Sequence, residues 1–157
     1  MNNLIYSILL SMIPIAELRG GIPYALANGI SPVTAYFACT LANLMAFPIV
    51  YIFFGFFHDI FSKMDWYKRL FDKLVLRTRG KVEDKIEKWG FWGLMIFVMI
   101  PLPVTGAYTG SFAAWLFGIP KRKAFLAVSL GVFIAGLIVT AVFLSGSHAL
   151  DFLLKKM

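Results

Sequence analysis

Glu17 and Arg19 are the two charged side chains in residues 1–57, which are otherwise uncharged. On insertion scales an ionised side chain costs roughly 2.5–3.5 kcal/mol at the centre of a membrane-spanning helix, so such charges mark functional positions. The same stretch holds residues that interrupt a helix or loosen its backbone. These are Pro14, Gly20, Gly21 and Pro23. We interpret residues 13–24 as a broken helix that lines a polar site.

The spacing of the two charges bears on what they could do. Residues two apart point to nearly opposite sides of a helix but project together from an unwound segment. Arg19, with free N–H groups where a half-helix opens near Pro23, could bind an anionic head group. A desolvated Glu17 would favour its protonated form and could carry a proton for coupling. The alternative is a structural ion pair that ties the loop to its neighbours.

A second interrupted stretch lies within the uncharged segment 91–117. It offers hydroxyl groups, glycines that permit close backbone approach, and two prolines that break a helix. Packing of small residues between helices is the alternative role for it. The candidate site residues here are Pro101, Pro103, Thr105, Gly106, Tyr108, Thr109 and Gly110. Asn43 is a further candidate, which could reach the site or bond a loop carbonyl, and the bond is favoured.

Composition indicates an all-α integral membrane protein. Of 157 residues, 60% are hydrophobic, and the mean hydropathy is +0.79, which lies outside the soluble range. The net charge is +7, yet nine of fifteen Lys/Arg lie between Lys63 and Lys88. Basic clusters beside apolar runs fit the cytoplasmic side of a membrane and anionic head groups better than nucleic acid. The single cysteine, Cys39, excludes an intrachain disulfide and a Cys-based metal cage.

The order of apolar and polar runs predicts one membrane domain over residues 1–157. The uncharged runs 33–57 and 124–144 are long enough to cross the hydrocarbon, and Ser31 with Pro32 forms a good helix start for the first. Trp66, Tyr67, Leu70, Phe71, Leu74 and Val75 have the spacing of an amphipathic interfacial helix. We expect a first repeat (1–57: re-entrant 4–28, membrane helix 33–57), an amphipathic cytoplasmic linker (58–88), a second repeat (89–146: re-entrant 91–117, membrane helix 124–144) and a tail after Ser145–Ser147 (147–157).

An internal repeat supports this division. Shifting residues 21–54 by 89 positions pairs Gly21 with Gly110, Gly29 with Gly118, and nine further identical residues. With a two-residue gap, Ile13–Pro14 also meets Ile100–Pro101. Pro/Gly-interrupted segments at matching positions of two halves point to a transporter site. If each interrupted run dips into the membrane and returns, both basic clusters share one side, and the halves form an inverted-topology repeat.

Two motifs of this sequence resemble those of the small multidrug export protein family, and the resemblance covers essentially the whole chain. They are Pro14-x-x-Glu17-x-Arg19-Gly20-Gly21-x-Pro23 and Pro101-x-Pro103-x-Thr105-Gly106-x-x-Thr109-Gly110. That family is similar in turn to the DedA (VTT-domain) superfamily, whose members have two opposed re-entrant hairpins. Several of those are implicated in moving lipids, including polyprenyl-phosphate carriers, across bilayers. The resemblance implies re-entrant hairpins and a transport function.

The sequence departs from the DedA pattern at one point. DedA-type proteins usually carry a pair of arginines in the second re-entrant motif, near an Ile-Pro like Ile100–Pro101. Here that motif has no charge, and Arg19 is the only deep cation. A phosphate-binding role would therefore rest on Arg19 and on backbone groups.

Three functions follow as hypotheses. The first is a flippase for an anionic amphiphile such as a polyprenyl lipid phosphate, with proton coupling as an option. The second is an exporter of lipophilic drugs or cations that uses Glu17, with cation–π contacts from aromatic side chains. The third is a non-transporting membrane assembly protein. We expect no enzymatic activity, cofactor, metal or nucleic-acid partner. Membrane lipids are the expected partners, in a homodimer of the cytoplasmic (inner) membrane with the basic loop 63–88 on the cytoplasmic side.

Overall fold

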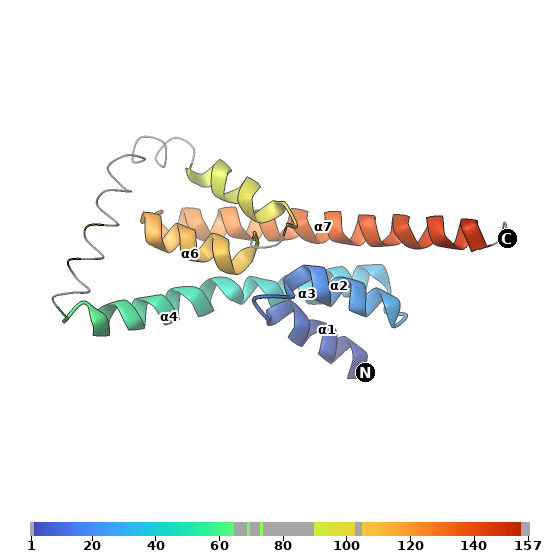
Figure 1. The fold of residues 1–157 in the computed structure, drawn as a ribbon, viewed down its shortest axis with the longest axis horizontal. Coiled ribbons are helices and arrows are strands. Elements are labelled where there is room, and N and C mark those ends of the chain that lie inside the picture. The colour runs from blue at the N-terminus through green and yellow to red at the C-terminus, as the bar shows by residue number, and fades with distance from the viewer. Residues whose placement is uncertain (1, 65–68, 70–72, 74–89, 103–104, 155–157) are drawn as a thin grey trace.

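The structure, a computed structural model, describes residues 2–64, 69, 73, 90–102 and 105–154 (Figure 1). All regular structure in these residues is helical, and no strand occurs among them. The labelled helices are α1 (Asn2–Met12), α2 (Glu17–Ala27), α3 (Pro32–Leu44), α4 (Ala46–Phe61), α6 (Ala107–Phe117) and α7 (Lys121–Leu154). A further helix, Gly90–Met99, precedes α6.

Helices α1 and α2 form the first hairpin. Helix α1 ends at Met12, because Pro14 disfavours helical geometry at the residue before it. Four residues later α2 begins, and the chain reverses direction (Figure 1). Helix α2 ends at a turn in which Gly29 has φ +76°, and the Ile30 N–H donates to the carbonyl of Ala25 at 3.1 Å. Both ends of the hairpin therefore lie to one side of its tip, residues 13–16, which is near the middle of the molecule (Figure 1).

The helix Gly90–Met99 and α6 form the second hairpin, whose tip comprises the described residues 100–102, 105 and 106. Gly118 has φ +71°, and the Ile119 N–H donates to Ala114 at 2.9 Å. Gly118, Ile119 and Ala114 are the residues that the 89-residue shift pairs with Gly29, Ile30 and Ala25. The two turns therefore share one backbone geometry, a helix end closed by a left-handed glycine.

Two long helical segments connect the hairpins into one bundle. Helices α3 and α4 together supply a candidate membrane span, Pro32–His58, and α7 supplies another, Lys121–Gly146. The Ser31 hydroxyl caps α3 by accepting from the Thr34 N–H at 3.3 Å, as the sequence predicts. The two segments run in opposite directions, and α3 packs on α7 (Figure 1). Each hairpin also reaches the other half, since α2 packs on α7 and α6 packs on α4.

Small side chains allow these helices to approach closely. Ala35 and Ala46 on α3 and α4, and Ala124 and Ala135 on α7, are all buried in the core. These are two of the identical pairs from the 89-residue shift. Close packing of alanine and glycine is typical of helices in membranes, where van der Waals contact is a main driving force.

Two predicted boundaries are wrong. Helix α7 continues through Ser145–Ser147 to Leu154, so no separate tail begins at residue 147. A single glycine costs a helix only about 1 kcal/mol relative to alanine and does not end it without a proline or a capping turn. Helix α4 likewise runs to Phe61 rather than ending at residue 57. The predicted amphipathic helix, with Trp66, Tyr67, Leu70, Phe71, Leu74 and Val75, lies outside the described residues.

Candidate functional site

Helix α2 opens at Glu17, which corrects the prediction that a half-helix opens near Pro23. Gly20, Gly21 and Pro23 all lie within α2. Pro23 removes one helical hydrogen bond, which the helix survives. The chain turns instead at Glu17, the only non-glycine residue with positive φ (+46°) in the described part of the chain. A left-handed backbone in a glutamate is costly and is typical of functional sites.

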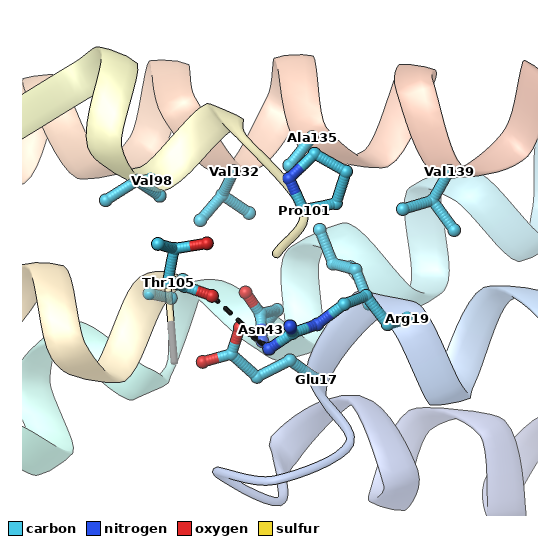
Figure 2. Close-up of a pocket in the computed structure, with 12 residues that line it drawn as sticks. Glu17, Arg19, Asn43, Val98, Pro101, Thr105, Val132, Ala135 and Val139 are labelled. Atoms are coloured by element: carbon cyan, nitrogen blue, oxygen red, sulfur yellow. Dashed lines mark hydrogen bonds and ion pairs between the residues drawn. The ribbon is translucent and has the colours of Figure 1, made fainter. Parts of the chain in front are cut away.

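The Glu17 carboxylate inserts into the second hairpin (Figure 2). Its Oε1 accepts a hydrogen bond from the Tyr108 backbone N–H at 3.3 Å, and the Ala107 N–H also faces it. Both donors belong to the first turn of α6, whose N–H groups have no helical acceptors. The carboxylate therefore caps α6 from the opposite hairpin, where the helix dipole also favours negative charge.

The Arg19 guanidinium crosses in the same direction. It donates to the backbone carbonyls of Leu102 and Thr105, the latter at 3.3 Å (Figure 2). The Thr105 hydroxyl fixes this loop by donating to the Ile100 carbonyl at 2.6 Å and accepting from the Leu102 N–H at 3.1 Å. Arg19 also approaches Glu17, with 4.0 Å between Nη2 and Oε2. The two charges do project together, although the positive φ of Glu17, rather than an unwound segment, brings this about.

Two cavities meet at this pair of charges. The outer one is an open cleft of about 600 Å³, lined by Pro14, Ile15, Ala16, Glu17, Arg19, Gly20, Thr105 and Thr109. Its volume is typical of a pocket for a small ligand. The inner one is about 10 Å³, roughly enough for a single water molecule, and Glu17, Arg19 and Thr105 line it too. These three residues form the wall between the cleft and the interior.

Asn43 closes the inner cavity from α3 (Figure 2). Its side chain is 1% exposed, and Nδ2 donates to the Ser11 carbonyl of α1 at 2.8 Å. The sequence left two roles open for Asn43, reaching the site or bonding a loop carbonyl. In the structure Asn43 lines the inner cavity, and the carbonyl that it bonds belongs to helix α1 rather than to a loop. Asn43 holds the end of α1 against α3 beside the charged pair.

Removing this amide should destabilise the bundle. Asn43→Ala leaves the buried Ser11 carbonyl without its donor, which costs about 1–3 kcal/mol. The midpoint of thermal unfolding in detergent should fall accordingly. Asn28→Ala is the matched control, because Asn28 Nδ2 also donates to a carbonyl at 2.8 Å but is exposed. Equal unfolding midpoints for the two variants would show that the buried Asn43 hydrogen bond stabilises the protein no more than the exposed Asn28 bond does.

The structure brings most of the predicted site residues to one place. Nine line the two cavities: Pro14, Glu17, Arg19, Gly20, Asn43, Pro101, Thr105, Gly106 and Thr109. Gly106 and Tyr108 contact the Glu17 carboxylate. Gly21 and Gly110 instead face the preceding helix of their own hairpins, Pro23 lies inside α2, and Pro103 is outside the described residues. Within the described part of the chain, no three His, Cys, Asp or Glu side chains gather as a metal site would require.

Sequence reasoning missed two parts of the site. The acceptors for Arg19 and Tyr108 are backbone carbonyls, of Leu102, Thr105 and Met12, and side-chain types cannot reveal them. The far wall of the inner cavity comes from α7, through Val132, Ala135 and Val139. The repeat held a signal for this wall, since the 89-residue shift pairs Asn43 with Val132.

Comparisons with known proteins agree with a membrane location. No curated protein and no solved structure matches the chain. The model of one family, described as "Putative small multi-drug export protein", matches residues 17–138, which include the charged pair, the segment Pro32–His58, α6 and the part of α7 up to residue 138. An export family and two candidate spans both point to the membrane. The match covers well over half of the sequence, and the chain therefore belongs to this small multidrug export family.

Proposed function

We propose that the protein is a small membrane transporter built as an inverted repeat of two re-entrant hairpins. The hairpin helices have 10 or 11 residues and so reach about 16 Å, half of a hydrocarbon core of about 30 Å. The long segments are antiparallel, and the hairpin tips meet between them (Figure 1). Transporters of this kind bind substrate where interrupted helices of two repeats meet near the membrane midplane.

The substrate class that the site supports best is an anionic amphiphile such as a lipid phosphate. The observation that carries this proposal is the state of Arg19. Its side chain is 26% exposed, against 7% for Glu17, and it lines the cleft. Among the described residues its hydrogen bonds go to neutral carbonyls, and the Glu17 carboxylate lies 4.0 Å away. A phosphate would be a stronger acceptor for the guanidinium than either carbonyl. The apolar side chains of Pro14, Ile15 and Ala16 in the same cleft suit the non-polar part of the molecule.

A second candidate is export of lipophilic drugs or cations; the family description names multi-drug export without a substrate charge. Glu17 lines both cavities, and no other acidic residue in the described ranges does so. A cation would need this carboxylate freed from α6 and from Arg19. The two candidates therefore differ in which charge is essential: Arg19 for an anion, Glu17 for a cation.

The test is head-group exchange in proteoliposomes with a fluorescent short-chain lipid phosphate and a neutral diacylglycerol analogue. Wild type should move the phosphate faster than protein-free vesicles do, and should leave the rate of the neutral analogue at its protein-free value. Arg19→Gln should lower the rate about tenfold to 10²-fold, because it removes a charge-assisted hydrogen bond, while Arg19→Lys should retain part of it. Glu17→Gln should keep exchange but lose any dependence on a pH gradient.

Arg122→Gln is the matched control, since Arg122 is exposed at the start of α7. Phosphate exchange that survives Arg19→Gln unchanged would refute the anion proposal. Export of a quaternary ammonium compound that requires Glu17 and not Arg19 would establish the cation candidate. Wild-type behaviour of both variants, with no exchange, would point to the assembly role.

A further inference from the structure

Arg19 has a structural counterpart in the other half of the molecule. Carried back from residue 21 to residue 19, the 89-residue shift pairs Arg19 with Tyr108, and both lie in the first turn of the second helix of their hairpins. Arg19 donates to the Leu102 and Thr105 carbonyls in the tip of the second hairpin. The Tyr108 hydroxyl donates to the Met12 carbonyl at the end of α1, in the first hairpin. Each hairpin thus holds the backbone of the other through one side chain.

We propose that Tyr108 is a positioning residue that keeps the hairpin tips closed, and that the substrate anion opens them by drawing Arg19 away from its two carbonyls. The proposal rests on the anion transport proposed above. We call the bonds of Arg19 and Tyr108 to the opposite tips the reciprocal bonds. They are equivalent by the repeat but differ in chemistry, because only Arg19 carries a charge that an anion can attract.

The cavities give the reason that the tips must separate. The inner cavity of about 10 Å³ cannot admit a phosphate, whereas the cleft of about 600 Å³ can hold one. An anion in the cleft is therefore stopped at the wall formed by Glu17, Arg19 and Thr105. Moving past this wall requires that the second tip leave the first, which breaks the reciprocal bonds.

Tyr108 lines neither cavity. It therefore acts on the substrate only through the hairpins and not by contact. A ligand that binds the separated tips must also open them. Its apparent affinity is therefore its intrinsic affinity multiplied by the fraction of molecules that are open. Loss of the Tyr108 hydroxyl removes one bond from the closed form alone. This should favour the open form by about fivefold, which corresponds to about 1 kcal/mol.

Arg19→Gln and Tyr108→Phe should consequently have opposite effects on binding. Short-chain phosphatidic acid should bind Tyr108→Phe up to about fivefold more tightly than wild type, and Arg19→Gln more weakly or not at all. Isothermal titration in nanodiscs measures both. Tyr51→Phe is the matched control, because the buried Tyr51 hydroxyl has no hydrogen-bond partner among the described residues.

A distance measurement tests the opening directly. Spin labels at Ile13→Cys and Leu102→Cys, in a Cys39→Ser background, report the separation of the tips by double electron–electron resonance. Both positions are exposed, by 46% and 55%, neither lines the cleft, and the Leu102 carbonyl survives the substitution. In Tyr108→Phe without ligand, the distribution of distances between the labels should shift to longer values. Phosphatidic acid should cause the same shift in the labelled protein that keeps Arg19 and Tyr108.

The outcomes separate this proposal from the transport proposal. Affinity and distance both unchanged in Tyr108→Phe would overturn the role of Tyr108, whether or not wild type moves lipid phosphate. Weaker binding by Tyr108→Phe would also overturn it, since that is the effect of a merely structural defect. If Tyr108→Phe lengthens the distance but wild type binds no phosphatidic acid, the proposed substrate class is refuted. The role of the reciprocal bonds in holding the tips together would then still stand.

Discussion

Gly106→Ala should abolish transport and lower the unfolding midpoint well below that of wild type. A Cβ at this position would lie 1.9 Å from Glu17 Oε2 and 2.8 Å from Oε1. The carboxylate cannot easily turn aside, because the Tyr108 N–H holds its other oxygen. The backbone φ of +155° is also one that alanine rarely adopts. Backbone strain of about 1–3 kcal/mol and overpacking of about 1–3 kcal/mol should add to each other.

A double variant separates these two contributions. Glu17→Ala removes the obstructing carboxylate, so Glu17→Ala/Gly106→Ala should be more stable than the sum of the single changes predicts. The backbone strain should remain. Gly55→Ala is the matched control, since a Cβ there meets nothing within 4 Å and α4 gains helix propensity. If Gly106→Ala and Gly55→Ala unfold with the same midpoint, the Glu17 carboxylate does not lie against Gly106.

The sequence predicted those parts of the fold that local chemistry decides. Ser31–Pro32 predicted the start of α3, because a hydroxyl cap followed by proline favours a helix start in any context. The repeat predicted matching turns at Gly29 and Gly118, and both glycines have the left-handed geometry that ends a helix. The family motif placed Glu17, Arg19 and Thr105 in one site, and the structure brings them together.

The position of the helix break was beyond the sequence because several residues could have caused it. Pro14, Gly20, Gly21 and Pro23 all disfavour a helix, yet only the region of Pro14 is non-helical. Tertiary contact decides the matter: Gly21 is needed in α2 for close packing on α1, and Glu17, the first residue of α2, caps α6. The Glu17 carboxylate and its Tyr108 donor are 91 positions apart, and Gly21 meets residues of a different helix, so local propensity cannot anticipate either contact.

Gly21→Ala should disrupt the first hairpin more than Gly110→Ala disrupts the second, although the repeat pairs these residues. A Cβ at Gly21 would lie 1.8 Å from Ser11 Oγ and 2.7 Å from the Ser7 carbonyl oxygen. At Gly110 it would lie 2.3 Å from Val98 Cγ2, with the next atom at 3.6 Å. A side-chain methyl can be displaced, but a backbone carbonyl moves only with its helix. Overpacking lowers the free energy of unfolding by about 1–3 kcal/mol, and the higher helix propensity of alanine offsets about 1 kcal/mol of that loss. The loss for Gly21→Ala should lie at the upper end of this range.

Relief variants test this difference in mechanism, with the unfolding midpoint in detergent as the measurement. Val98→Ala should restore part of the stability lost in Gly110→Ala, because it removes the obstructing Cγ2 methyl together with the Cγ1 methyl that packs at Gly131. Ser11→Ala should restore little in Gly21→Ala, since the Ser7 carbonyl remains at 2.7 Å. Full rescue by Ser11→Ala would contradict a backbone obstacle and would mean that α1 can shift along α2. The two hairpins then share a sequence pattern and a turn geometry but differ in rigidity, because the first is packed through backbone and the second through a side chain.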